Sequence, residues 1–340
     1  MSVMNPPFHG ISFRLRDHAT QEFREIDLPL VQADAEVFFW VDLESVDLVP
    51  LFGLLDYLRI DRKVADHLNA TEILPWIVER PNCIAFRLYE ISRPETHLET
   101  STGVRVMEAT RLLVIVGNAF VLTWHPRPLD LVADVRIACH DAFRLAGKTP
   151  GFIVFLLLQQ CLYDYADLNL ANDNFLDRFE PSVTGEVALS FTRTIVIAGG
   201  NILLLKKLTT NLHIVLMLLA TKRTPFVSED AQASFRELKN NTMAIRGEVD
   251  SSRDLLDGVV GAIQAAAAER TSKIATVLTA VSVVMLPLGL VAGIWGMNFP
   301  SIPLAQHEYG FWWLLGGMAT LALLLILAFR RLGWVGLGNR

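Results

Sequence analysis

The most distinctive chemical pattern of this sequence lies in a C-terminal segment that carries no charge. Small and apolar side chains recur there at intervals of three or four residues, which places them on one stripe of a helix. Small residues let helices approach closely and leave backbone carbonyl groups within reach. The pattern therefore suits either tight helix packing or a pore wall around a hydrated ion. The stripe consists of Leu278, Ser282, Leu286, Gly289, Gly293 and Gly296.

Residue types that commonly bind metals show no ligand-like spacing elsewhere. Cys83, Cys139 and Cys161 are widely separated and form no CxxC pair, which argues against a disulfide framework and a thiolate metal site. The histidines show no HxH, HxxH or HExxH pattern. His307 lies beside Glu308 in a short segment near the C-terminus, and histidine suits zinc. These two residues are candidate metal contacts, and the sequence indicates no resident cofactor.

The composition argues against two large classes of protein. The chain has 30 Lys and Arg residues against 36 Asp and Glu, and its net charge of −6 is a poor match for nucleic acid. It contains no GxSxG element and no GxxxxGK[ST] loop, so neither a hydrolase of that type nor ATP hydrolysis is indicated. We therefore expect a protein that is not an enzyme and has no nucleic-acid partner.

The elements that must position the stripe are transmembrane helices. Hydrophobic residues make up 52% of the chain and charged residues 19%, against about 25% charged in an ordinary globular protein. Two uninterrupted apolar runs, 274–295 and 309–329, are each long enough to cross a hydrocarbon core, which takes about 20 helical residues. The sequence thus predicts two spans in contact with membrane lipid, an external loop at 296–308 and a basic tail at 330–340.

The positions of Lys and Arg predict how the two spans are oriented. Arg270 and Lys273 precede the first span, Arg330 and Arg331 end the second, and the connecting loop contains neither residue type. Cytoplasmic flanks are enriched in these residues. The N-terminus has no apolar run typical of a cleaved signal peptide. We expect a multi-pass protein of the cell inner membrane with both termini in the cytoplasm.

Ahead of the spans, we expect an α+β arrangement that begins with a cytoplasmic α/β domain at 1–148. Runs rich in β-branched and aromatic residues predict strands, and apolar periodicity after turn residues predicts short helices. The predicted strands are 37–41, 84–91 and 112–124, and the predicted helices are 51–58 and 61–68.

Residues 149–273 predict a helical region and a stalk. The short apolar runs 152–158 and 212–220 are below spanning length and fit buried helices of a soluble domain. Pro225 is expected to divide two long helices. From 229 to 295 only glycines weaken the helical pattern before Pro287, so one rod would join the stalk to the first span; the alternative is a stalk helix broken near Gly258.

Two helices alone cannot enclose a water-filled path, because polar backbone exposed to lipid is too costly. The spans are therefore either anchors, or parts of an assembly of several copies. Pro287 frees the carbonyl of Val283 at membrane depth, and that oxygen needs a partner from protein or water. This requirement favours a pore wall over tight helix packing. Met285 and Leu286 are both candidates for its narrowest point.

The end of the first span carries a recognisable motif. It reads Gly293-Ile294-Trp295-Gly296-Met297-Asn298, follows an apolar helix containing Leu286-Pro287, and precedes a short loop and a second span that ends in Arg330-Arg331. This combination resembles the CorA superfamily of divalent-cation channels and transporters, the two-span GxN family. The resemblance extends less sharply upstream through 40–43 and 112–124.

The resemblance implies a funnel-shaped homopentamer with the first span of each subunit lining a central pore. Leu278, Ser282, Met285, Leu286, Gly289 and Gly293 would face that pore, and Pro287 would kink or loosen its helix. Gly296, Met297 and Asn298 would form the selectivity filter. Mg²⁺ gives up water reluctantly, so neutral amide and carbonyl oxygens can bind its hydration shell without removing it.

Several positions depart from the magnesium-type pattern. The loop lacks the MetProGlu element, and Ile302-Pro303 followed by 309–312 resembles the ZntB branch, which is associated with zinc. Gly289 stands where many members carry threonine, and 239–241 read Lys-Asn-Asn where a metal-sensing aspartate is common. These departures argue against closure by Mg²⁺ bound between cytoplasmic domains.

The sequence therefore predicts a divalent-cation channel or transporter. The leading expectation is Mg²⁺ influx driven by membrane potential, with Co²⁺ and Ni²⁺ as further candidate ions. The first alternative is Zn²⁺ transport of the ZntB type, with possible proton coupling. The second is a membrane-anchored sensor or scaffold that does not conduct.

Overall fold

The structure is a computed structural model, and it falls into two compact units. The first unit comprises residues 1–182 and 190–259, and the second comprises 183–189 and 260–340. The residues whose structure is described are 9–14, 24–25, 37–66, 68, 73–92, 106–142, 149–176, 187–222, 226–297, 302–303 and 307–331.

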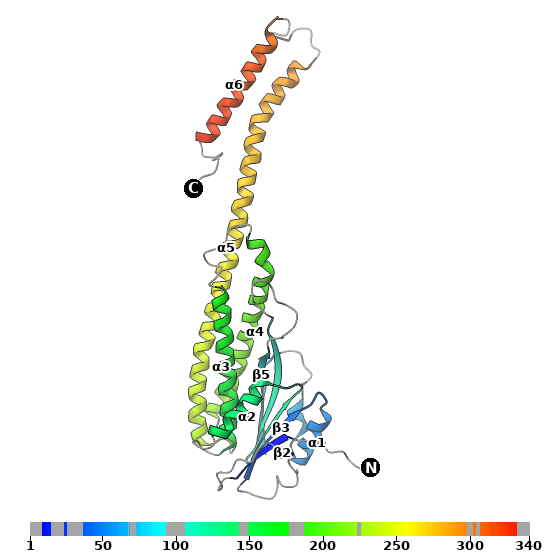
Figure 1. Cartoon of the computed structure of the whole chain (residues 1–340), viewed down its shortest axis with the longest axis vertical. Coiled ribbons are helices and arrows are strands. Elements are labelled where there is room, and N and C mark those ends of the chain that lie inside the picture. The colour runs from blue at the N-terminus through cyan, green and yellow to red at the C-terminus, as the bar shows by residue number, and fades with distance from the viewer. Residues whose placement is uncertain are drawn as a thin grey trace. The chain divides into compact units, whose positions relative to one another are not determined.

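The first unit is built on a mixed sheet (Figure 1), which has seven strands within the described residues and the order β2-β1-β3-β7-β6-β5-β4. Neighbouring strands are antiparallel except for β3 and β7, which are parallel. The strands are β1 (His9–Arg14), β2 (Arg24–Glu25), β3 (Val37–Glu44), β4 (Ile77–Arg80), β5 (Cys83–Ser92), β6 (Glu108–Val116) and β7 (Phe120–His125).

The predicted strand 112–124 is wrong, because it is a hairpin of two strands. The turn begins at Gly117, whose N–H donates to the carbonyl of Phe120 at 2.9 Å. The stretches 112–116 and 121–125 are buried throughout and mostly apolar, because both faces of these strands are covered. This buried apolar character is what predicted one strand, although Gly117-Asn118 between the two runs is a local signal for a hairpin. The predicted strands 37–41 and 84–91 are confirmed within β3 and β5.

Each face of the sheet has its own hydrophobic core. One face packs on α1 (Val49–Tyr57) and on a short 3₁₀ helix, η2 (Arg62–Ala65). Helix α1 confirms the helix predicted at 51–58, and Pro50 lies in its first turn. The helix predicted at 61–68 is too long, because Asp66 is already extended and ends η2.

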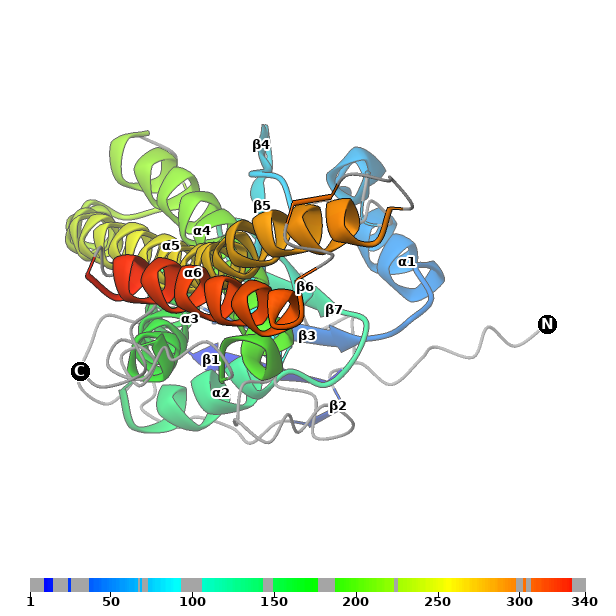
Figure 2. The same cartoon turned by 90° about the horizontal axis from the view of Figure 1, so that it is seen from above.

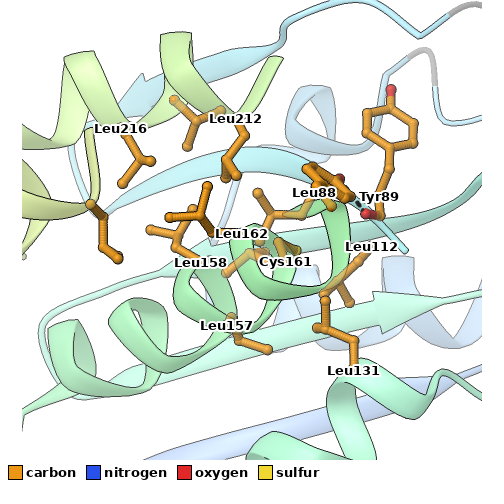
Figure 3. Close-up of a cluster of buried hydrophobic side chains, with 14 of the residues drawn as sticks. Leu88, Tyr89, Leu112, Leu131, Leu157, Leu158, Cys161, Leu162, Leu212 and Leu216 are labelled. Atoms are coloured by element: carbon orange, nitrogen blue, oxygen red, sulfur yellow. Dashed lines mark hydrogen bonds between the residues drawn. The ribbon is translucent and has the colours of Figure 1, made fainter. Parts of the chain in front are cut away.

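The other face of the sheet is covered by helices, as Figure 2 shows from above. These are α2 (Asp130–Ala142), α3 (Pro150–Leu176) and α4 (Val187–Thr221). On α3, Leu158 and Leu162 lie on the side that faces Leu212 and Leu216 of α4, whereas Leu157 lies on the side away from them (Figure 3). The predicted buried helices at 152–158 and 212–220 are thus confirmed.

Polar side chains fasten these helices to the sheet at particular points. The hydroxyl of Tyr165 on α3 donates to the carbonyl of Tyr89 at 2.5 Å. On α4, the Nδ2 of Asn211 donates to the carbonyl of Arg87 at 3.0 Å, and the Oδ1 of Asn201 accepts from the N–H of Met107 at 3.0 Å. Buried hydrogen bonds of this kind fix the register of a helix on a sheet.

The long helix α5 runs from Glu229 to Trp295 without a break at Gly258 or at Pro287. The predicted single rod is therefore confirmed, and Pro225 itself lies outside the described residues. A further helix, α6, spans Gly310–Arg331. Among the described residues, α5, α6 and the Thr194–Thr221 part of α4 are long and apolar enough to cross a membrane, although half of the α4 stretch is buried inside the structure.

Replacing Leu157 with alanine should lower the free energy of unfolding by about 2–5 kcal/mol, because this side chain is fully buried in the hydrophobic core that α3 forms with the sheet and its neighbouring helices. Leu170→Ala on the same helix is the matched control, since Leu170 is 59% exposed and should change stability by less than about 0.5 kcal/mol. Thermal unfolding of the purified full-length protein measures both. Equal effects of the two substitutions would contradict this packing.

Candidate functional site

The predicted stripe lies on the part of α5 that belongs to the second unit. Its side chains are exposed in the single chain: Leu278 is 66% exposed and Leu286 is 74% exposed. A methyl group built on Gly289 or Gly293 would meet nothing within 4 Å. The stripe is therefore a smooth face of α5 that no part of the described chain covers.

The opposite face of the same helix is sheltered. Ala280 is only 6% exposed, and Val284, Leu288, Val291 and Trp295 are partly buried. These residues follow one another at three- or four-residue steps, about half a turn around the helix from the stripe. The helix thus has one face turned toward the rest of its own unit and one left for other partners.

Helix α6 contributes to that shelter. Val291 of α5 and Trp313, Leu314 and Gly317 of α6 border a common apolar cavity of about 500 Å³. The described residues that line it include no Asp, Glu, Lys or Arg. The second span therefore packs near the sheltered face of the first span and leaves the stripe uncovered.

The stripe itself offers few side-chain ligands. The hydroxyl of Ser282 donates to the carbonyl of Leu278 at 2.8 Å, so its hydrogen is used within the helix. Pro287 lies inside α5, where it cannot donate the usual backbone hydrogen bond. Met285 is 63% exposed. The chemistry of this surface is therefore that of apolar side chains and backbone carbonyls.

The predicted filter begins where α5 ends. The N–H of Gly296 donates to the carbonyl of Ala292 at 3.0 Å, and the N–H of Met297 donates to that of Ile294 at 3.2 Å. A side chain at position 296 would crowd the Ala292 carbonyl oxygen, only 3.3 Å from a built Cβ. The last carbonyls of a helix carry partial negative charge, which attracts cations. Asn298 lies outside the described residues.

His307 and Glu308, the candidate metal contacts of the predicted loop, lie just before α6. The Nδ1 of His307 accepts a hydrogen bond from the N–H of Tyr309 at 3.3 Å, and the carbonyl of His307 accepts from Gly310 at 2.9 Å. The ring also lines the apolar cavity. His307 thus caps α6 and retains only Nε2 for a metal, beside the exposed Glu308. Across the described residues, no group of three or more His, Cys, Asp or Glu is placed to hold a metal.

An acidic pocket in the first unit was not predicted from the sequence. It has a volume of about 340 Å³ and lies between β5, α2 and α3. The only local signals were Asp130 and Asp134 one turn apart and Asp164 and Asp167 one turn apart; their meeting depends on the fold. Its carboxyl groups belong to Glu90, Asp130, Asp134, Asp164 and Asp167.

Two of these carboxyl groups bind protons more readily than usual. Burial raises the pKa of Glu90, although backbone N–H groups of Leu131 and Asp130 oppose the shift. Burial also raises the pKa of Asp164, and the negative charges of Asp134, Asp167 and Asp130 add to this.

The comparisons with known proteins agree over nearly the whole chain. Residues 35–331 match the family described as CorA-like Mg²⁺ transporter protein. The Cobalt/magnesium transport protein CorA of Thermotoga maritima is 24% identical over 327 residues, which cover 94% of this chain and 91% of that protein.

Solved structures share the fold. The complete structure of the CorA magnesium transporter from Methanocaldococcus jannaschii superposes with a TM-score of 0.73 at 18% identity, covering 96% of this chain and 98% of that one. The ZntB cytoplasmic domain from Vibrio parahaemolyticus superposes with a TM-score of 0.57 at 12% identity, covering 78% of this chain and all of that domain.

The raised pKa of Asp164 predicts a pH-dependent effect of Asp164→Asn. Because the folded state binds this proton more readily than the unfolded chain, ionised Asp164 destabilises the fold at neutral pH. This cost disappears as the pH falls through the folded-state pKa toward the ordinary value of 3.8. The neutral amide should therefore raise the melting temperature near about pH 8 and raise it less near about pH 5.

Asp250→Asn is the control for that experiment. Its exposed carboxylate lies 2.6 Å from Lys206, and this pairing lowers the pKa of Asp250, so the substitution should slightly destabilise the protein near neutral pH. If Asp164→Asn lowered the melting temperature near about pH 8, the proposed repulsion in the pocket would be contradicted.

Proposed function

This chain belongs to the CorA-like Mg²⁺ transporter family, and we propose that it carries Mg²⁺ into the cell through a pore lined by α5. Members of the family are divalent-cation transporters of membranes. We further propose that the protein lies in the inner membrane with both termini in the cytoplasm, as the Lys and Arg residues that flank the spans indicate.

The uncovered stripe on α5 is the observation that carries this proposal. Two helices of one chain cannot enclose a water-filled path, so conduction needs several copies. When copies are arranged around an axis, each stripe can face that axis while α6 lies on the outer side of its own α5. The number five rests on the resemblance to the CorA superfamily, and we propose a homopentamer on that basis.

We propose that Gly296, Met297 and Asn298 form the filter at the outer mouth of the pore. The C-terminal end of α5 supplies carbonyl oxygens of partial negative charge, and Asn298 would add an amide oxygen from each copy. Neutral oxygens can hold a hydrated Mg²⁺ without stripping its water, and Co²⁺ and Ni²⁺ are further candidate ions.

The membrane potential is a sufficient driving force for inward flux. A charge crossing 100 mV gains about 2.3 kcal/mol, and a divalent ion gains about twice that. The sequence shows no nucleotide-binding loop that would couple transport to ATP hydrolysis.

Zn²⁺ transport is the second candidate. His307 lies at the start of α6 and keeps one ring nitrogen available, and imidazole nitrogen suits Zn²⁺ better than Mg²⁺. The likeness to the ZntB cytoplasmic domain concerns the fold alone.

Replacing Asn298 with alanine should abolish ion influx, because the mouth loses its ring of amide oxygens. The measurement is influx into proteoliposomes loaded with separate Mg²⁺- and Zn²⁺-sensitive dyes, with potential and pH gradients imposed in turn. Asn174→Ala, at an exposed position of α3 in the first unit, is the matched control and should conduct like the wild type.

The dye that responds identifies the transported ion as Mg²⁺ or Zn²⁺. The gradient that drives influx, potential or pH, shows whether transport is potential-driven or proton-coupled. Undiminished flux through the Asn298 variant would refute the filter. No flux of either ion through a folded wild-type protein, with or without metal on the opposite side, would favour a non-conducting sensor or scaffold.

Gly289→Ala should reduce influx severalfold while leaving the fold intact. The added methyl group meets nothing within 4 Å in the single chain, and alanine favours a helix over glycine by about 1 kcal/mol. Any loss of flux must therefore come from what the stripe faces in the assembly. Gly316→Ala on α6 is the same change, also into open space, and should leave flux unchanged. Equal flux in both variants would argue against a pore lined by the stripe.

A further inference from the structure

A buried cluster of charged side chains lies where β3 and β7 end. The Asp42 side chain is 5% exposed and that of His125 is 3% exposed. The Oδ1 of Asp42 accepts a hydrogen bond from Thr123 at 2.5 Å and lies 3.1 Å from the Nε2 of His125. Its Oδ2 accepts from the guanidinium of Arg136 on α2 at 3.2 Å. One carboxylate therefore connects two parallel strands to a helix.

The second ring nitrogen of His125 also faces an acceptor. Its Nδ1 lies 2.6 Å from the backbone carbonyl of Arg127. A carbonyl oxygen can only accept a hydrogen bond, and so can the carboxylate of Asp42. Both contacts can exist together only when both nitrogens carry hydrogen, which makes His125 a positively charged imidazolium.

We propose that the proton held on His125 fastens the turn between β7 and α2, and that this turn opens as the surrounding pH rises. When the ring loses one proton, it can donate to only one of its two acceptors. The charged Asp42 holds the remaining N–H more strongly than a neutral carbonyl does. The carbonyl of Arg127 then faces a nitrogen lone pair, and the contact that closes the turn is lost.

The turn is short and leads directly into α2. It comprises residues 126–129, with Pro126 and Pro128 restricting its backbone and Leu129 buried. Beyond it, the carboxylate of Glu90 accepts a hydrogen bond from the N–H of Leu131 at 2.8 Å. The turn is also held by the Nε of Arg127, which donates to the Oγ1 of Thr110 on β6 at 2.6 Å. His125 therefore controls one of several contacts at the start of α2.

The charges around His125 favour its protonated form. Among the described side chains, Asp42 and Glu44 face it from β3, Arg136 faces the shared carboxylate from α2, and Arg127 lies in the turn. Burial alone would lower the pKa of His125, but the hydrogen bond and charge of Asp42, the carbonyl of Arg127 and the charge of Glu44 together outweigh burial, so the pKa is raised above 6.5. The stabilisation is fully present below about pH 6.5 and is lost as the pH rises through the folded-state pKa.

The acidic pocket on another side of α2 also titrates and must be separated from His125. Its carboxylates repel one another more as they ionise, so they too would loosen α2 as the pH rises. The Asp164→Asn background removes one of these carboxylates without touching the cluster around Asp42. The transition assigned to His125 should persist in that background at the same pH.

The first test measures the pKa of His125 in the full-length protein in detergent. Mass spectrometry of hydrogen–deuterium exchange at the C2 carbon of each imidazole ring, as a function of pH, gives the pKa of individual histidines. His125 should titrate above 6.5, whereas His213 should titrate below it, because burial and the nearby Arg246 and Lys239 lower its pKa. A pKa of His125 at or below 6.5 would overturn the proposal.

The second test follows amide exchange in the peptide that covers the turn and the first turn of α2. After correction for the pH dependence of intrinsic exchange, exchange should become about fivefold faster across the titration of His125, as expected for the loss of one net hydrogen bond. His125→Asn should abolish this transition. Exchange in the wild type that does not depend on the titration of His125 would also overturn the proposal.

Arg136→Gln keeps the proposal testable if His125→Asn does not fold. The side chain of Arg136 is 39% exposed, so the substitution is milder, and it removes a second cation from Asp42. The pKa of His125 and the opening of the turn should then both shift to higher pH. A shift to lower pH, or opening that no longer follows the titration of His125, would contradict the proposed role of the proton.

Discussion

Polar groups cannot be left facing lipid, and this constraint governs what a chain with two spans can do. The first span of this protein has two different faces. One is sheltered within its own unit, where α6 borders a shared apolar cavity, and the other is a stripe of small and apolar residues that a single chain leaves uncovered. On our account the stripe is completed by other copies, so ion conduction is a property of the assembly.

The helices α5 and α6 could be predicted from the sequence, because their signals are strong and local. The two long apolar runs predicted α5 and α6, and the absence of proline between 229 and 286 predicted one helix where a broken stalk was the alternative. The stripe could be read from spacing alone. The filter could be recognised only by its resemblance to a known family, because Gly296-Met297-Asn298 has no chemical meaning outside that context.

Other features could not be predicted, because they depend on residues that are distant in sequence. Asp42 and His125 are separated by 83 positions, and only the parallel pairing of β3 with β7 brings them together. The acidic pocket likewise joins Glu90 to residues of α2 and α3. The hairpin of β6 and β7 is different, because it is local: Gly117-Asn118 between the two apolar runs is a typical hairpin signal, and the single predicted strand missed it.

The three native cysteines make a direct test of the stripe practical. They are buried, and burial raises the pKa of Cys83 to about 11 and that of Cys139 to about 12, so they should react slowly with thiol reagents. Gly293→Cys places a thiol on the stripe, and Ile294→Cys places one at nearly the same depth on another face. A water-soluble thiol reagent should modify the first and block influx while sparing the second. Equal reactivity, or modification of Gly293→Cys without loss of influx, would contradict a pore lined by the stripe.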